Sequence, residues 1–96
     1  YAIFMVDAEG SITNWNLGAQ QITQYTSAEI VGRNVDIFLR GEDRADNLSK
    51  RILSRAASSG RYFGEGTVLK RDGSSFWASL VVEPIRGTGG EIAGFA

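Results

Sequence analysis

The chain has 96 residues and a net charge of −1, from ten basic and eleven acidic side chains, and it contains neither histidine nor cysteine. This length suits one domain with one core. Because the charges balance, the dense basic surface that a phosphate backbone needs is missing, so we expect no nucleic-acid partner. The longest uninterrupted apolar run, Ala2–Val6, is far too short to cross a bilayer, and we expect no membrane segment within the chain.

The absence of histidine and cysteine excludes most site chemistry. Zinc sites of the usual nitrogen and sulfur type, histidine-based triads and a proximal histidine for haem cannot form. The acidic pair Glu42-Asp43 is explained by the favourable charge of acids in the first turn of a helix. We therefore expect no catalytic residue and no metal site.

The N-terminal residues are predicted to form a β-hairpin. Tyr1–Val6 is apolar and rich in aromatic and β-branched residues, Asp7–Gly10 is a turn cluster, and Ser11–Trp15 alternates between apolar and polar positions. Asn16 is a favourable N-cap for a short helix that continues to Thr23.

Short helical turns are expected next. Ser27 is suited to cap the turn Ala28–Val31, and Gly32 stands where a glycine with positive φ often ends a helix. Asn34–Leu39 is brief and apolar, which favours one further helical turn.

One long helix is predicted from Glu42-Asp43 to about Ser58. Its apolar residues fall on one stripe at helical spacing, and Gly60 follows as a stop signal. The stripe consists of Ala45, Leu48, Ile52 and Ala56.

The remaining residues read as β-structure. Tyr62–Arg71 and Ser74–Arg86 flank Asp72-Gly73, which predicts a two-residue type I′ connection. Gly87–Gly90 predicts a second turn before a fifth strand, Glu91–Ala96. Hairpin-linked strands with helices between them predict an α+β domain whose helices cover one face of an antiparallel sheet. The fifth strand is still in progress at the last residue, so we expect the sequence to be an excerpt of a longer, multidomain signalling protein.

The order and spacing of many short motifs resemble the PAS family across nearly the whole length. They are Ala2-Ile3-Phe4-Met5-Val6-Asp7 with Gly10, Ile12-Thr13-Asn14-Trp15-Asn16, Tyr25–Arg33, Gly41-Glu42-Asp43-Arg44, Gly64-Glu65, Lys70-Arg71-Asp72-Gly73, Phe76-Trp77 and Glu83-Pro84-Ile85.

The resemblance implies a five-stranded antiparallel sheet in the order 2-1-5-4-3, cupped by helices. It also implies a sensory or interaction module that dimerises and passes a conformational signal to an attached effector, such as a sensor histidine kinase. We therefore expect residues 1–96 to form one non-catalytic PAS-like domain, cytoplasmic and homodimeric in its full-length context. A ligand-free dimerisation or protein-interaction module is the alternative.

One face of the fourth predicted strand is wholly apolar and should point at the helices. Together with residues from other elements it would line the internal cavity of the family. The candidate lining residues are Phe4, Val6, Val35, Phe38, Leu48, Ile52, Tyr62, Val68, Phe76, Ala78 and Leu80. Two interpretations stay open: these side chains fill the core, or the small Ala78 leaves space for an apolar ligand.

Flavin binding is tested by comparison with branches of the family. Gly32-Arg33-Asn34 resembles the start of the cysteine motif of the light-sensing LOV branch, but the reactive position would be Val35. The two strand asparagines that hold the flavin there would fall on Val68 and Ala78, so we expect no LOV-type flavin adduct. The FAD-binding branch often has a tryptophan where this chain has Tyr62, which leaves FAD a minor possibility beside an apolar small molecule.

The opposite face of the same strand carries Trp77 and Val81. With Trp15 from a neighbouring element, these residues are the candidate interface. The resemblance implies that an N-terminal helix or a second protomer covers this face; partial burial under loops of the domain itself is the alternative.

Overall fold

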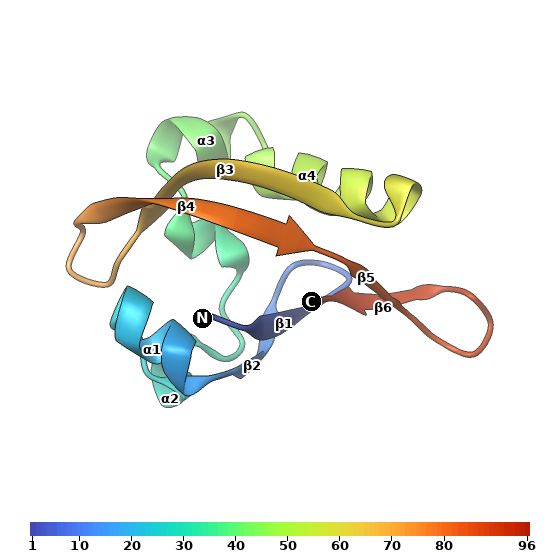
Figure 1. Ribbon diagram of the computed structural model, residues 1–96, viewed down its shortest axis with the longest axis horizontal. Helices are drawn as coiled ribbons and strands as arrows, with labels where there is room; N and C mark the ends of the chain where they lie inside the picture. The colour runs from blue at the N-terminus through green and yellow to red at the C-terminus, as the bar shows by residue number, and fades with distance from the viewer.

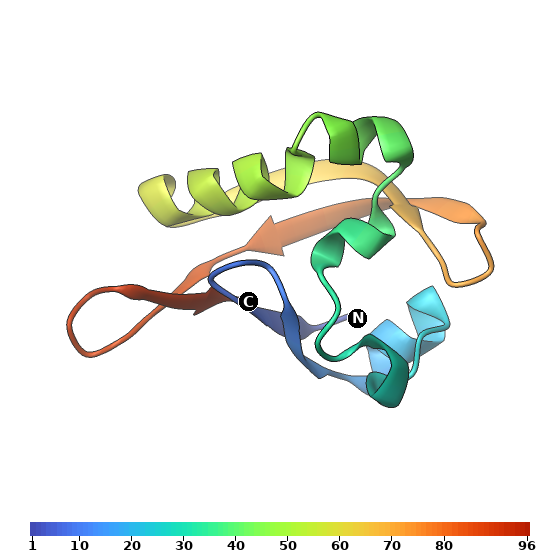
Figure 2. The ribbon, with the colours of Figure 1, turned by 180° about the vertical axis from the view of Figure 1, so that it is seen from behind.

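The computed structural model describes all residues 1–96, which form short strands and helices (Figure 1). In chain order the elements are β1 Phe4–Asp7, β2 Ile12–Trp15, α1 Leu17–Thr23, α2 Ser27–Ile30, the 3₁₀ helix η1 Val35–Phe38, α3 Gly41–Ala45, α4 Leu48–Ser59, β3 Tyr62–Leu69, β4 Ser75–Val82, β5 Pro84–Arg86 and β6 Ile92–Phe95. Seen from behind, α4 and η1 lie in front of the ribbon formed by β3 and β4 (Figure 2).

The strands form two antiparallel groups instead of the single sheet expected. One group has the order β2-β1-β6-β5, and β3 pairs with β4 in the other. The strand predicted at Ser74–Arg86 is interrupted at Glu83 because Pro84 has no N–H to donate to a ladder. Glu83 and Ala96 nevertheless exchange two backbone hydrogen bonds of 3.0 and 2.9 Å, which link the groups at one point.

A gap separates β4 from β1. Backbone pairing joins β6 to β1 only at Val6 and Asp7, and β4 pairs with β3 alone. Because β4 and β5 together make up the fourth predicted strand, the strands follow the expected order 2-1-5-4-3, but the ladder between β4 and its neighbour is interrupted. The two chain ends lie beside this gap (Figure 1).

The long helix expected from Glu42 is two helices. The chain breaks at Asn47, which has φ 56° and ψ 38° in the left-handed region. Asparagine is one of the few residues other than glycine that adopts this conformation readily, so the apolar stripe alone gave no sign of the break. The stop at Gly60 is confirmed, with φ 83°.

Two local predictions are corrected. Thr26, not Ser27, caps α2, in a capping box in which Thr26 and Glu29 each bond the other's backbone N–H. The β3–β4 connection is also not a type I′ turn: Gly73 has positive φ but Asp72 does not, and Lys70 pairs with Ser74 around a three-residue loop. The predicted N-cap Asn16 is confirmed, because its side chain accepts a hydrogen bond from the N–H of Ala19.

The fully buried core lies where β1, β2 and β6 meet the helices. It comprises Val6, Ile12, Ile30, Phe38, Ala56 and Phe95. Ile12 and Ile30 are its largest fully buried side chains. Gly94 allows β6 to approach β1, since a Cβ at that position would lie 2.3 Å from the carbonyl oxygen of Val6.

A candidate ligand cavity behind the sheet

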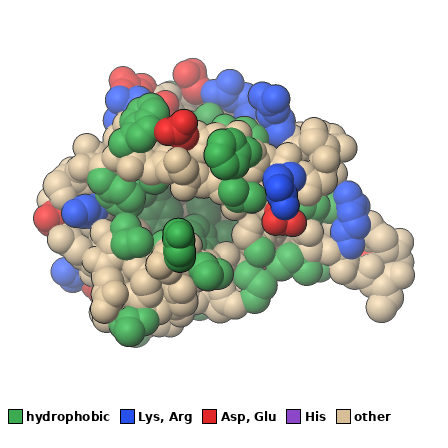
Figure 3. Space-filling view, in the orientation of Figure 1, with side chains coloured by type: hydrophobic (Ala, Val, Ile, Leu, Met, Phe, Trp, Pro, Cys, Tyr) green, Lys and Arg blue, Asp and Glu red, His purple; other side chains and the backbone are tan.

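A cavity of about 700 Å³ lies between the strands and the helices. Its walls come from β1, η1, α4, β4 and the end of β6, and nearly all of its lining residues are hydrophobic. The space-filling view shows a hollow below β4, surrounded by hydrophobic side chains (Figure 3). The mouth of the cavity is thus on the strand side, at the gap between β4 and β1.

Most of the candidate pocket residues line this cavity. They are Phe4, Val6, Val35, Phe38, Ile52, Val68, Phe76, Ala78 and Leu80. Phe76, Ala78 and Leu80 border the cavity as the alternation of β4 predicts, but Ser79 and Val81 of the opposite face border it as well. Lining residues that the prediction did not include are, among others, Ile3, Leu53 and Phe95.

Leu48 and Tyr62 do not line the cavity. They border a separate depression of about 260 Å³ on α4, together with Arg51, Ile52 and Arg55. The guanidinium of Arg55 lies 6.0 Å from the centre of the Tyr62 ring, a cation–π geometry at the solvent boundary. Tyr62 therefore lies half-buried beside α4, outside the residues that line the cavity.

Two of the lining hydroxyl groups, those of Thr23 and Ser49, already have partners within the fold. The hydroxyl of Thr23 donates to the carbonyl of Ala19 at 2.8 Å and accepts from the N–H of Tyr25 at 3.3 Å. The hydroxyl of Ser49 donates to the carboxylate of Asp36. No buried side-chain nitrogen or oxygen lacks a hydrogen-bond partner. The buried side chains of the wall therefore offer little hydrogen bonding beyond what the fold itself uses.

Trp15 belongs to the interior, which corrects its assignment to the outer sheet face. Its ring is stacked on Phe38 with centroids 5.8 Å apart and an interplanar angle of 8°, and it also contacts Phe4. The indole N–H donates to the carbonyl of Tyr25 at 2.9 Å. Because Phe38 lines the cavity, this aromatic cluster forms part of the cavity's supporting wall.

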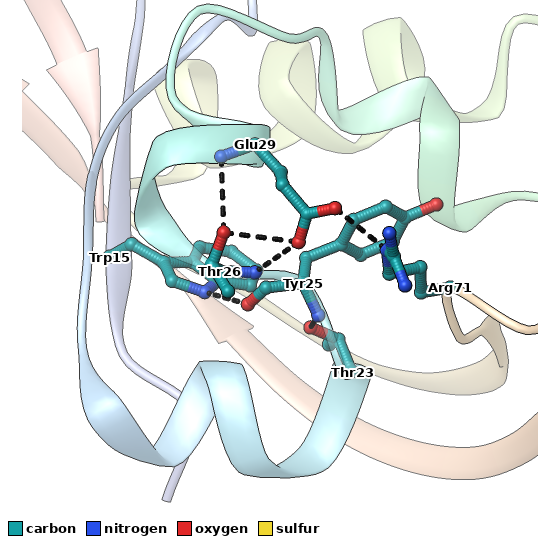
Figure 4. Close-up of polar contacts among 6 residues, drawn as sticks. All are labelled: Trp15, Thr23, Tyr25, Thr26, Glu29 and Arg71. Carbon is teal, nitrogen blue, oxygen red and sulfur yellow. Dashed lines mark hydrogen bonds and ion pairs between the residues drawn. The ribbon is translucent and has the colours of Figure 1, made fainter.

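A polar clamp joins the β3–β4 turn to the first helices (Figure 4). The guanidinium Nε of Arg71 lies 2.8 Å from the carboxylate Oε2 of Glu29 on α2. The backbone N–H of Arg71 donates to the carbonyl of Thr23 at 2.9 Å. These contacts hold the turn over α1, beside the lining residue Thr23.

The same clamp lowers the pKa of the Glu29 carboxyl. Hydrogen bonds from the backbone N–H and hydroxyl of Thr26 are the main causes, and the positive charge of Arg71 adds to them. The pKa of Asp72, in the turn itself, is lowered by hydrogen bonds from the hydroxyl and N–H of Ser74. Both carboxylates are favoured in their ionised form in the folded protein.

The outward face of β3 and β4 carries exposed apolar side chains. Trp77 is 68% exposed and Val81 is 47% exposed. Phe63, which sequence inspection missed, lies directly across from Val81 in the register and is 69% exposed. Period-two alternation in β3 was the signal that would have placed Phe63 on this face. We call Phe63, Trp77 and Val81 the outer patch.

Of the residues compared with the flavin-binding branches, Val35, Val68 and Ala78 line the cavity, whereas Asn34 and Tyr62 do not. Val35 lines it and has no thiol, while the amide of Asn34 donates to the carbonyl of Glu9 at 3.1 Å and accepts from the N–H of Asp36 at 3.0 Å. Tyr62 lies at the separate depression on α4. The absence of a LOV-type adduct stays a prediction.

An antiparallel set of strands with helices over one face and an apolar cavity between the layers defines an α+β domain built around an internal pocket. The family model described as the PAS fold matches residues 1–96, and this chain belongs to the PAS family. The PAS domain of a protein from Colwellia psychrerythraea is similar in structure, with a TM-score of 0.90 and 26% identity over 98% of this chain and 79% of that chain.

Curated relatives are much longer than this chain. Two-component system protein A of Emericella nidulans is 40% identical over 85 residues, which make up 88% of this chain and 12% of the relative. Phototropin-1A of Oryza sativa subsp. japonica is 35% identical over 78 residues, 81% of this chain and 8% of the relative. A domain of a sensor histidine kinase/response regulator from Geobacter sulfurreducens shares the fold, with a TM-score of 0.75 and 21% identity over 98% of this chain and 79% of that chain.

Family membership and these relatives support a role in sensory signalling. No helix of the chain has both the length and the apolar character needed to span a membrane.

Proposed function

We propose that this chain is a sensory module that relays a ligand- or partner-dependent conformational change to an attached effector, a sensor histidine kinase or a similar regulator. The observation that carries the proposal is the apolar cavity of about 700 Å³ in a domain of the PAS family. Cavities of this size are typical of small-molecule sites. The relative in Emericella nidulans, named as a two-component system protein, supports the class of effector.

The position of the cavity provides a route for the signal. Phe95 and Ala96 at the end of β6 line it, as do Tyr1–Phe4 at the start of the chain. A molecule that contacts these residues in only one arrangement of the strands would shift the population toward that arrangement. The domain itself contributes binding and movement, with catalysis left to the effector.

The exposed outer patch favours a second candidate, a protein-interaction module that works without a ligand. Phe63, Trp77 and Val81 together present an apolar surface of the kind found at interfaces. Within the first proposal the same patch serves a homodimer of the full-length, cytoplasmic protein. An FAD-binding redox sensor is the less favoured alternative, because Asn34 and Tyr62 do not line the cavity.

A chimera tests the relay. Residues 1–96 would replace the matching segment of the Emericella nidulans protein, and the signalling response of that two-component system would be measured with and without Ala78→Phe, which fills the cavity. We expect the substitution to lock the response at one level. Native mass spectrometry and an absorbance scan of the purified domain would reveal a retained molecule or a flavin. An unchanged response to Ala78→Phe would overturn the ligand-dependent relay and leave the interaction module.

A further inference from the structure

The cavity has no charged lining residue. Every residue that borders it is either hydrophobic or one of the three neutral hydroxyl residues Thr23, Ser49 and Ser79. Burying a charged group without a partner is very unfavourable in free energy, because the group loses its hydration. A bound carboxylate, phosphate or ammonium would find no opposite charge on the wall.

The two lining hydroxyl residues that are not exposed, Thr23 and Ser49, already use their hydroxyls within the fold. Thr23 uses its hydroxyl both as a donor and as an acceptor within the fold. Ser49 donates its hydroxyl to the carboxylate of Asp36. Ser79 is exposed on β4.

Aromatic rings supply much of the remaining wall. Phe4, Phe38, Phe76 and Phe95 all line the cavity, and they come from four separate elements or segments. Such rings gain free energy mainly by contact with apolar surface, at roughly 25 cal/mol per Å² removed from water. The wall is therefore matched to hydrocarbon and not to hydrogen-bonding groups.

We infer that the cavity selects an uncharged, hydrocarbon-rich small molecule that forms few or no hydrogen bonds with the protein. This inference rests on the proposed function and adds the chemical class of the ligand. It disfavours charged cofactors such as flavin nucleotides for this chain, and it predicts discrimination by charge between molecules of equal shape.

A matched pair of fluorescent probes tests the discrimination on the unaltered domain. N-phenyl-1-naphthylamine is neutral, and 8-anilino-1-naphthalenesulfonate has the same rings with one sulfonate added. We expect the neutral probe to bind one molecule per chain and the anionic probe to bind at least about tenfold more weakly. In competition, 1-octanol should displace the neutral probe at lower concentration than octanoate or octylammonium at pH 7.5.

Two substitutions of alanine by phenylalanine locate the binding. Ala78→Phe places a ring inside the cavity and should abolish binding of the neutral probe, whereas Ala93→Phe alters an exposed position on β6 and should leave it unchanged. Circular dichroism checks that both variants fold. If Ala78→Phe does not fold, methyl NMR shifts of Val68 and Leu80 on probe addition locate the site in the unaltered protein.

Each result decides the inference. Neutral binding that is lost in Ala78→Phe, with weaker binding of all charged competitors, supports it. Binding of a charged probe at the cavity as tightly as the neutral one would overturn the ligand class while leaving a ligand sensor standing. If no neutral probe binds but native mass spectrometry finds a charged molecule retained, the inferred ligand class is overturned and the ligand-dependent function still stands. If no molecule of any charge binds, the ligand-dependent function is overturned as well.

Discussion

Arg71 and Glu29 join two parts of the chain that are far apart in sequence, with 2.8 Å between Nε of the guanidinium and Oε2 of the carboxylate. The pair is exposed, and exposed ion pairs contribute little to stability by themselves. Its importance lies in the adjacent backbone bond from Arg71 to Thr23, which positions the β3–β4 turn beside that lining residue.

Removing this ion pair should loosen the turn without unfolding the domain. For Arg71→Met, which keeps an apolar stem, we expect Tm to fall by no more than about 5 °C. Hydrogen exchange of the backbone amide at position 71, which donates to Thr23, should become faster than in the unaltered protein. Arg61→Met is the control, because Arg61 pairs with Glu83 at 3.5 Å on the surface and should leave the exchange of Arg71 unaltered. Equal exchange in all three proteins would contradict the clamp.

The pH dependence of stability follows from the lowered pKa of Glu29. Its folded-state pKa lies below the ordinary 4.5, so the ionised form is favoured by folding. The stabilisation is complete above about pH 4.5 and is lost as the pH falls through the lower, folded-state pKa. Asp72 acts in the same direction, with its loss beginning below its ordinary value of 3.8.

Glu29→Gln isolates the contribution of Glu29. Between pH 5 and 7 we expect the variant to melt at a lower temperature than the unaltered protein. The gap should narrow as the pH falls below about 4.5, because the unaltered protein then loses the same interaction. Melting curves from pH 2.5 to 7 measure both effects. Two curves that stay parallel over this range would show that the ionised carboxylate contributes nothing.

Local sequence signals predicted much of the fold, and their failures have identifiable causes. Asn16 as a cap and Gly60 as a stop are set by chemistry within one turn, so both were predicted correctly. The break at Asn47 was missed because a left-handed asparagine leaves the apolar periodicity on either side intact. The interruption before Pro84 follows from its missing N–H, a signal that was present in the sequence and was given too little weight.

The last residue of α2, Ile30, and its C-cap, Val31, should differ sharply in their sensitivity to substitution. Ile30 is completely buried, while Val31 is 44% exposed. Ile30→Ala removes buried methyl and methylene groups and leaves a void, so we expect a loss of about 2–5 kcal/mol in the free energy of unfolding. Val31→Ala should change it by less than about 1 kcal/mol. Urea unfolding monitored by circular dichroism compares the two, and similar losses would place Ile30 outside the core.

Replacement of two strand glycines by alanine should have different effects on Tm. A Cβ at Gly94 would lie 2.3 Å from the backbone oxygen of Val6, so Gly94→Ala must push β6 away from β1. Nothing lies within 4 Å of a Cβ built at Gly66, and alanine there reduces the freedom of the unfolded chain. We expect a strongly lowered Tm for Gly94→Ala and an unchanged or higher Tm for Gly66→Ala. A tolerant Gly94 would argue against the close β1–β6 approach.

The side chains that face the cavity could be predicted where strand alternation fixes their direction. They could not be predicted where the packing of neighbouring elements fixes it. The side of β4 that bears Phe76, Ala78 and Leu80 follows from period two, and all three line the cavity. Tyr62 is at the first residue of β3, and its direction depends on how α4 ends beside it. Trp15 was misplaced because a four-residue strand does not reveal which side the neighbouring helices cover.

Fluorescence of the two tryptophans should separate the interior from the outer patch. Trp77 is 68% exposed, with its N–H 3.0 Å from the carboxylate of Glu65, whereas Trp15 is half-buried against Phe38. In Trp77→Phe, the emission comes from Trp15 and should be blue-shifted relative to the unaltered protein and poorly quenched by acrylamide. In Trp15→Phe, it should be red-shifted and readily quenched.

Acrylamide quenching of Trp77, measured at increasing protein concentration, then tests whether the outer patch is an interface. If a second copy covers the patch, quenching of Trp77 should decrease as protein concentration rises, in step with the dimer fraction from analytical ultracentrifugation. Adding Phe63→Ser to the Trp15→Phe variant, in which Trp77 is the only tryptophan, should abolish that decrease in quenching, because it removes the apolar residue across from Val81. Ser75→Ala, on an exposed position at the far end of β4, serves as the control. Quenching that is independent of concentration while the protein dimerises would place the dimer contact elsewhere on the domain.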